Sequence, residues 1–296
     1  MNNIRKFIDG QSLIRASILD ATEAVRQMQQ IQNSGPVATL LVGRAMVGAS
    51  LMASHLKDGE MVSLYFTGDG PIEKVFAEAT YEGAVRGFSA RPQVEIPVVN
   101  NVPNLSATLG KGFLSVIRTH PKREHSQRGT VELQSGEIGE DLAYYLQQSE
   151  QKRSAISVGV KIDSNGHVVS AGGILIELMP QANTHIEIIV EDMFRRAGSF
   201  SESLASGQSL EQILDRYIGG FAIHEIEHPY QVVYTCRCSR NRLLDAMELF
   251  SEKDFEDMIA KNENVDARCE FCGRTYSLEP AEIRDIQKQR FSSRHH

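Results

Sequence analysis

The chain has 296 residues, of which 41% are hydrophobic and 23% are charged, and its net charge is −7. This composition is typical of a soluble protein with about two domains. No apolar run approaches the ~18 residues that a membrane span needs, and no apolar signal-peptide core follows Met1. We therefore expect a cytoplasmic protein with no membrane partner.

Residues 1–180 are predicted to form an N-terminal mixed α/β-layer domain of the α+β class, because helical patterns interrupt a series of antiparallel strands. Apolar spacing predicts helices at 20–31, 36–56 and 139–149, the second starting with Pro36 at its first position. Alternation and turn residues predict strands at 12–18, 62–67, 72–80, 84–89, 113–118, 129–134, 155–162 and 167–178.

Residues 181–229 are predicted to be a helical, acidic and metastable linker. Between residues 181 and 227, eight acidic residues outnumber three basic ones, which favours a solvated segment. Asn183 or Thr184 is expected to cap a helix through Arg196, and Ser209 with Gln212 has the capping-box pattern. Because such short helices are marginally stable alone, they need a surface on which to dock.

Residues 230–296 are predicted to form a small C-terminal zinc-binding domain. A strand is expected at 230–235, helices are expected after Ser239 and Ser251, and a final helix is expected from Pro280. A hairpin lies between the second and the final helix. A module of this size has a marginal core of its own.

All four cysteines lie in this last segment, as Cys236-Arg237-Cys238 and Cys269-Glu270-Phe271-Cys272-Gly273. Four thiolates in two close pairs suit tetrahedral Zn²⁺, because each pair can bind one metal ion from a tight turn. We therefore predict one Zn²⁺ per chain, bound in the reduced state by Cys236, Cys238, Cys269 and Cys272. His224 and His228 are close in sequence but are not needed as ligands.

The tetrad suits either a purely structural zinc site or a redox switch. Structural Zn²⁺ contributes ~10–16 kcal/mol to small peptides, so its loss should unfold the module. Thiolates are nucleophiles toward oxidants, and each pair is close enough to form its own disulfide. The Cys236–Cys238 ring is very tight, near the ~7 Å Cα limit in an extended strand. We therefore expect Cys269–Cys272 to form first, followed by zinc loss and then by Cys236–Cys238.

Unfolding of the zinc module would then release the linker, if the linker docks on the first domain and the module steadies it. Release would expose apolar side chains that can bind other proteins. The candidates are Ile186, Ile189, Val190, Met193 and Phe194. The alternative is that these residues are ordinary core-facing positions of helices.

The sequence resembles the redox-regulated 33-kilodalton chaperonin family of bacterial heat-shock holdases over nearly its whole length. The resemblance rests on the cysteine tetrad and on four further motifs, which are Gly43-Arg44-Ala45-Met46, Gly68-Asp69-Gly70-Pro71-Ile72, Gly136-Glu137-Ile138-Gly139-Glu140-Asp141 with Tyr144-Tyr145, and Ala171-Gly172-Gly173 through Met179-Pro180.

This resemblance implies an ATP-independent chaperone that binds unfolded or partly unfolded client proteins and prevents their aggregation under oxidative stress. The reduced, zinc-bound form is implied to be inactive. Oxidation is implied to form the Cys236–Cys238 and Cys269–Cys272 disulfides, to release zinc, to unfold the linker and to promote a homodimer. The resemblance assigns no role to the acidic charge of the linker or to the tail 291–296.

Two other classes of protein are weighed against the chaperone. A thiol oxidoreductase would use Cys269 and Cys272, and an insulin-reduction assay separates it from a holdase. Gly110-Lys111 lacks the remainder of a phosphate loop, and His120 and His125 are expected to be loop residues, so we predict no enzyme. A structural zinc-ribbon protein that binds nucleic acid is disfavoured, because residues 228–296 carry eleven basic and twelve acidic residues.

Overall fold

The computed structural model describes residues 3–96, 98–99, 102–120, 122, 126–226 and 229–291. The chain divides into two compact units, Met1–Thr235 and Cys236–His296. Both units combine helices and strands, in agreement with the predicted α+β class.

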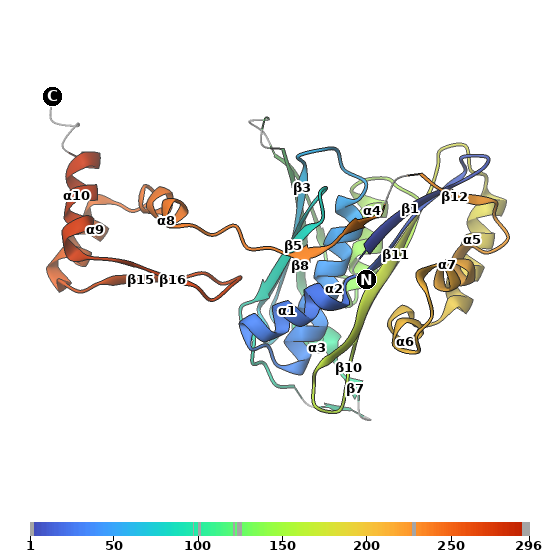
Figure 1. The fold of residues 1–296 in the computed structure, drawn as a ribbon, viewed down its shortest axis with the longest axis horizontal. Coiled ribbons are helices and arrows are strands. Elements are labelled where there is room, and N and C mark those ends of the chain that lie inside the picture. Colours follow the sequence, from blue (N-terminus) through green and yellow to red (C-terminus); the bar gives the residue numbers. More distant parts are fainter. Residues whose placement is uncertain are drawn as a thin grey trace. The chain divides into compact units, whose positions relative to one another are not determined.

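Two six-stranded sheets form the framework of the first unit (Figure 1). The first sheet has the order β10-β11-β2-β1-β12, with β13 also paired to β1, and its strands are β1 (Asn3–Asp9), β2 (Ile14–Asp20), β10 (Ser154–Ile162), β11 (Val168–Leu178), β12 (Ile223–Glu225) and β13 (Tyr230–Gln231). The second sheet has the order β14-β5-β4-β3-β8-β9, and its strands are β3 (Met61–Gly68), β4 (Lys74–Thr80), β5 (Ala84–Ser89), β8 (Gly112–Thr119), β9 (Gln127–Glu132) and β14 (Val233–Tyr234). A short ladder joins β6 (Val98–Val99) to β7 (Val102–Pro103).

Helix α2 (Pro36–Ala53) lies between the two sheets (Figure 1) and is buried along its length except at Pro36 and Arg44. Glycines permit this packing, since a Cβ at Gly48 would lie 2.4 Å from the Leu142 side chain. Our expectation that no apolar run approaches the length of a membrane span was wrong for this helix. It is long and apolar enough to span a membrane, but 89% of it is buried inside the protein, as in the core helix of a globular domain.

Three further helices belong to this part of the chain, α1 (Thr22–Gln32), α3 (Leu105–Leu109) and α4 (Ile138–Gln148). The predicted helices and strands of residues 1–180 are confirmed to within a few residues at their ends. The strand predicted at 12–18 begins instead at Ile14, because the Asp9 carboxylate accepts hydrogen bonds from the backbone N–H groups of Gln11, Leu13 and Ile14 and holds residues 10–13 in a turn. Strand β1 was not predicted, because its apolar residues are interrupted by charged ones.

Helices α5 (Thr184–Ala197), α6 (Phe200–Ala205) and α7 (Leu210–Ile218) cover the face of the first sheet that points away from α2 (Figure 1). The Asn183 cap and the capping box of Ser209 and Gln212 are both present, as predicted. Helix α6 was not predicted, because its six residues are too few to show helical periodicity.

A second apolar cluster joins these three helices to the first sheet. The sheet contributes Phe7, Ile14, Ala16, Ile18, Ile174 and Ile176, and the helices contribute Val190, Ala197, Phe200, Ile213, Leu214, Tyr217 and Ile218. Successive residues of a strand face opposite sides, so Leu175 belongs to the core around α2 while its neighbours Ile174 and Ile176 face the linker helices. The docking surface that such short helices require is therefore provided by the first sheet.

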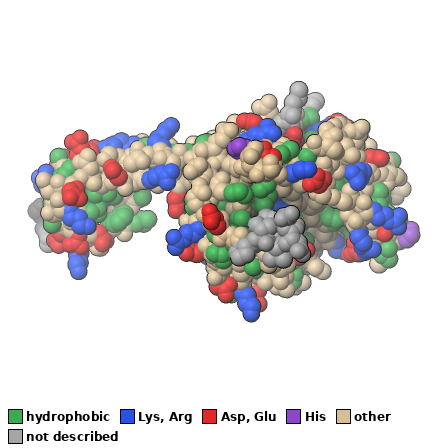
Figure 2. Space-filling model, turned by 90° about the horizontal axis from the view of Figure 1, so that it is seen from below, with side chains coloured by type: hydrophobic (Ala, Val, Ile, Leu, Met, Phe, Trp, Pro, Cys, Tyr) green, Lys and Arg blue, Asp and Glu red, His purple; other side chains and the backbone are tan. Residues whose placement is uncertain are grey.

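The second unit contains α8 (Arg240–Met247), α9 (Glu252–Lys261), β15 (Val265–Arg268), β16 (Thr275–Leu278) and α10 (Pro280–Phe291). Within residues 236–291, the described part of this unit, the buried apolar residues are Met247, Phe255, Leu278, Ile283 and Phe291. Leu249 is 87% exposed in the turn between α8 and α9, and hydrophobic side chains are visible on the surface of this unit in Figure 2. The core of this unit is therefore small.

The single strand predicted at 230–235 is two short strands. β13 pairs antiparallel with β1 in the first sheet, and β14 pairs parallel with β5 in the second. Between them, Val232 is buried in the core of the first unit. This burial breaks the strand, and the chain passes from one sheet to the other before it reaches the first cysteine.

Candidate metal centre

The β15–β16 hairpin positions the second cysteine pair. The N–H of Cys269 donates to the carbonyl of Arg274, and the N–H of Gly273 donates to the carbonyl of Cys269, each at 2.9 Å. Gly273 has a φ of 70°, in the left-handed region that glycine adopts without steric cost. The two bonds close a tight turn in which Cys269 and Cys272 present their sulfurs together.

The first cysteine pair lies in the segment that leads into α8. Ser239 caps this helix by accepting a hydrogen bond from the N–H of Arg242 at 3.2 Å. The guanidinium of Arg240 donates to the carbonyl of Ser277 at 2.9 Å and pairs with Glu282. The segment that carries Cys236 and Cys238 is thereby tied to strand β16 and helix α10.

The four sulfurs meet in one cluster, with all Sγ atoms within 4.8 Å of one another. The Cys236 and Cys269 sulfurs are 3.6 Å apart, and those of Cys238 and Cys272 are 3.3 Å apart. A tetrahedral ion with Zn–S bonds of ~2.3 Å places its sulfurs about 3.8 Å apart, so the residues fit a metal ion. All four are half-buried free thiols. The structure thus brings together every residue that the sequence predicts as a ligand.

The pKa values of the thiols are also consistent with a site for a cation. Burial raises the pKa of Cys236 to about 12 and also raises the pKa of Cys272. Burial acts in the same direction on Cys238, but the Tyr276 hydroxyl and the neighbouring thiols outweigh it and lower that pKa to about 7. Because the pKa values of Cys236 and Cys272 are raised while that of Cys238 is lowered, these three thiols do not ionise together near neutral pH without a cation among them.

Tyr276 is a residue of this site that sequence reasoning missed. Its hydroxyl donates to the Cys238 sulfur across 3.2 Å. Tyr276 lies on β16, opposite Ala267, so the hairpin turns it back toward the first cysteine pair. The sequence signal that could have identified it is a tyrosine four residues after Cys272, in the strand that follows the second cysteine pair.

The histidines considered with the tetrad lie elsewhere or outside the described residues. His224 pairs with Ile8 in the first sheet, and among the described residues the group that could hold a metal ion consists of the four cysteines. His228 and His125 lie outside the described residues. His120 borders a cavity of about 310 Å³ beside His55.

A serine, a histidine and a carboxylate do meet inside the first unit. Ser17 Oγ lies 2.7 Å from His55 Nε2, and His55 Nδ1 lies 2.8 Å from Glu177 Oε2. Ser17 is 0% exposed, so its hydroxyl cannot reach a substrate in this fold. The arrangement resembles a hydrolytic triad in geometry but not in accessibility.

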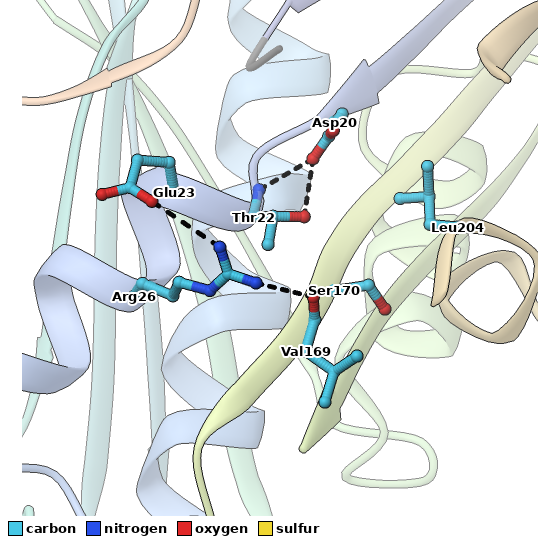
Figure 3. Close-up of a pocket in the computed structure, with 7 residues that line it drawn as sticks. All are labelled: Asp20, Thr22, Glu23, Arg26, Val169, Ser170 and Leu204. Carbon is cyan, nitrogen blue, oxygen red and sulfur yellow. Dashed lines mark hydrogen bonds and ion pairs between the residues drawn. The ribbon is translucent and has the colours of Figure 1, made fainter. Parts of the chain in front are cut away.

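A cavity of about 480 Å³ lies where the first turns of helix α1 meet strand β11, with Leu204 of helix α6 on its edge (Figure 3). In Figure 3, Leu204 of α6 faces the end of β2 and strand β11. Asp20 accepts hydrogen bonds from the N–H and hydroxyl of Thr22, and Arg26 donates to the carbonyl of Val169 at 3.0 Å. The Arg26 hydrogen bond thus ties helix α1 to strand β11, and the Asp20 hydrogen bonds fix the start of α1.

Charge on the surface shows no footprint for nucleic acid on the face drawn in Figure 2, where Lys and Arg alternate with Asp and Glu. Fold and site together therefore define an α+β protein whose small second unit carries a four-cysteine cluster suited to a metal ion. In its first unit, helices α5, α6 and α7 cover one face of the first sheet.

The sequence matches the family model described as Hsp33 protein over residues 2–279. A 33 kDa chaperonin of Thermodesulfovibrio yellowstonii is 35% identical to the chain, and the match covers 90% of this chain and 92% of the relative. A 33 kDa chaperonin of Symbiobacterium thermophilum is 34% identical, with 93% of each chain covered. The crystal structure of the 33 kDa chaperonin of Thermotoga maritima has a TM-score of 0.88 at 29% identity and covers 98% of this chain and 99% of that chain.

The chain therefore belongs to the Hsp33 family, which confirms the resemblance noted in its sequence. Its relatives are named chaperonins, and this membership supports a chaperone function.

Proposed function

We propose that this chain is a redox-regulated, ATP-independent holdase of the cytoplasm that binds unfolded or partly unfolded client proteins under oxidative stress. The observation that carries the proposal is the four-cysteine cluster in a unit with a small core, preceded in the sequence by helices that dock on an apolar sheet. In the reduced state one Zn²⁺ is held by Cys236, Cys238, Cys269 and Cys272, and the holdase is inactive.

The metal supplies the charge that keeps four neighbouring sulfurs as thiolates. The five buried apolar residues of the second unit supply little hydrophobic stabilisation, so the fold of this unit depends on the thiolate cluster. Oxidation to the Cys236–Cys238 and Cys269–Cys272 disulfides removes the ligands and therefore removes that support. The distances among the sulfurs do not select this pairing, which follows from the resemblance to the family.

The linker is the element that transmits the change. Of its candidate apolar residues only Val190 is fully buried, while Ile186, Ile189, Met193 and Phe194 are half-buried. Such partial burial gives α5 a weak hold on the sheet. Undocking uncovers both the helices and the apolar face of β1, β2 and β11, which is a continuous surface for clients.

The functional division is proposed as 1–180 for client binding and dimerisation, 181–229 for the linker and 230–296 for the zinc switch, with a homodimer as the oxidised, active form. The boundary at 230 differs from the compact unit that begins at Cys236, because β13 and β14 lie in the sheets of the first unit.

The test compares reduced and peroxide-treated protein in an assay of light scattering by a thermally unfolding client, without ATP and with mild warming. We expect suppression of scattering only after oxidation, and its loss after addition of reductant. Equal suppression in both states would contradict the switch. Turnover in an insulin-reduction assay would instead support the alternative of a thiol oxidoreductase.

A further inference from the structure

The Cys238 sulfur accepts a hydrogen bond from a side chain, that of Tyr276, whereas the sulfurs of Cys236 and Cys272 accept hydrogen bonds from the backbone. Cys236 and Cys272 accept hydrogen bonds from backbone N–H groups of Cys238 and Arg274. The Cys238 sulfur accepts the hydroxyl of Tyr276 at 3.2 Å. A side-chain donor can be removed by substitution, whereas a backbone donor cannot.

We propose that Tyr276 is a positioning residue of the redox switch, whose hydroxyl holds and shields the Cys238 sulfur so that Cys238 is the last of the four cysteines to react with a peroxide. The inference rests on the proposed zinc-bound, redox-regulated function and adds a residue that sets the order of its reactions. With a metal ion bound all four sulfurs would be thiolates, so they would differ in their hydrogen bonds and not in their ionisation. A hydrogen bond to a thiolate engages the electron pair that would attack the oxidant, and outer-shell donors orient metal-binding sulfurs.

The shield matters because proximity alone favours a different product. The Cys238 and Cys272 sulfurs are 3.3 Å apart, closer than the 3.6 Å between Cys236 and Cys269. If Cys238 reacted as readily as Cys272, a disulfide between these two would form easily. Holding Cys238 back removes this close competitor of Cys269 for the partnership with Cys272.

The oxidation is a two-electron step with peroxide as the oxidant. The thiolate of Cys269 or Cys272 attacks one peroxide oxygen, the O–O bond breaks, and the leaving hydroxide takes up a proton to become water. The second thiolate then attacks the resulting sulfenic sulfur, forms the S–S bond and displaces a hydroxide, which becomes a second water. Two sulfurs lose one electron each, and the peroxide gains both.

The experiment uses the full-length, zinc-loaded chain as wild type, Y276F and S277A. Y276F removes the hydroxyl and keeps the ring. S277A is the matched control, because the Ser277 hydroxyl is on the next residue of the same strand and bonds Asp266 instead of a cysteine. Samples receive less than one equivalent of hydrogen peroxide, are quenched with an alkylating reagent, and are mapped by mass spectrometry for the state of each cysteine.

We expect Cys238 to be modified last in the wild type and in S277A. In Y276F, Cys238 should be modified together with the other cysteines, and the Cys238–Cys272 disulfide should increase several-fold. Zinc affinity, measured by competition with a chelator, should fall about tenfold, as for other outer-shell substitutions. With Co²⁺ in place of zinc, the sulfur-to-cobalt charge-transfer bands of Y276F should shift to lower energy.

If Cys238 is the first or second cysteine to be modified in the wild type, the inference is overturned by that result alone. Identical disulfide maps and cobalt spectra for Y276F and wild type would overturn it as well. A Y276F protein that binds less than one metal ion per chain would also overturn it, because the hydroxyl would then be required for folding. Failure of the wild type itself to bind zinc or to release it on oxidation would instead contradict the proposed function.

Discussion

At the scale of single residues, the most concentrated charge in the core lies around Glu177. Its carboxylate contacts His55 at 2.8 Å, Lys152 at 3.2 Å and the guanidinium of Arg15. Burial raises the pKa of Glu177, but these partners outweigh burial and hold it well below its usual range. Burial lowers the pKa of His55, against the opposing effect of Glu177.

These shifts predict that acid destabilises the first unit. The depressed pKa of Glu177 gives stability above the unfolded value of 4.5, and this is lost as the pH falls below that value. The depressed pKa of His55 keeps the folded ring neutral, so protonation favours unfolding as the pH falls below 6.5. The free energy of unfolding, measured by urea titration, should therefore fall as the pH drops below 6.5 through His55 and fall further below 4.5 through Glu177.

Glu177→Gln should lower the free energy of unfolding by about 2 kcal/mol at neutral pH, because it removes the buried carboxylate that the partly exposed cations Arg15 and Lys152 contact. It should also flatten the pH dependence below 4.5. Glu191→Gln, on the exposed side of α5, is the control that should leave both quantities unchanged. A Glu177→Gln protein as stable as the wild type would show that the network contributes nothing to the fold.

At the scale of elements, α5, α6 and α7 each place a glutamate against a basic residue in the first sheet or directly beside it. Glu187 of α5 pairs with Arg153 at 3.4 Å, Glu202 of α6 pairs with Lys161, and Glu211 of α7 pairs with Arg5. The expectation that the acidic charge of the linker is simply solvated was therefore incomplete. Its carboxylates also face basic residues beside β10 and in β10 and β1.

Replacing all three of these glutamates by glutamine should loosen the docked linker modestly. Exposed ion pairs contribute roughly 0.2–1 kcal/mol each, and salt screens them, so the triple variant should be cleaved faster within residues 181–227 by limited proteolysis at low salt only. At high salt, the wild type and the variant should be cleaved at the same rate. Equal cleavage at low salt would assign the docking to apolar contacts alone.

Tyr217 joins the three linker helices to one another and to the sheet. Its ring lies 5.0 Å from that of Phe194 and 6.2 Å from that of Phe200, and its hydroxyl donates to the carbonyl of Gly198 at 3.1 Å. Tyr217→Ala should cost about 3 kcal/mol of docking, since it removes a buried aromatic ring. We therefore expect this variant to suppress client aggregation even when reduced.

Tyr217→Phe is the matched control, because it keeps the ring and loses only the hydroxyl. It should remain inactive when reduced. If reduced Tyr217→Ala were as inactive as the wild type, undocking of the linker would not be the activating event.

Sequence patterns predicted the elements whose stability is local and missed those that depend on distant partners. Pro36, the Ser209–Gln212 capping box and the turn at Ser164-Asn165-Gly166 fix their elements through neighbours in sequence. Strand β12 exists because Phe7 and Ile8 of β1 pair with it across more than two hundred residues, which no local pattern records. For the same reason the four cysteines were predictable from their spacing, while Tyr276 required the register of the hairpin.

At the scale of the whole molecule, the two units differ in what holds them together. The first has an extensive core around α2 and a second core beneath the linker, whereas the second has five buried apolar residues. Removal of metal from the reduced protein with a chelator should therefore unfold α8–α10 and leave the sheets of the first unit intact. Circular dichroism should show partial loss of helix that is restored by zinc, and a spectrum unchanged by the chelator would make the metal dispensable for this fold.

The proposed switch requires that oxidation at the cysteines undocks helices that lie in the other unit. The measurement that tests this most directly is hydrogen exchange of α5, α6 and α7, followed by mass spectrometry in the reduced zinc-loaded form and in the peroxide-treated form. We predict that backbone amides in residues 184–218 lose protection on oxidation in step with zinc release, while those of β3, β4 and α2 keep it. Unchanged protection of α5–α7 after complete zinc release would contradict the switch and leave the tetrad as a structural metal site.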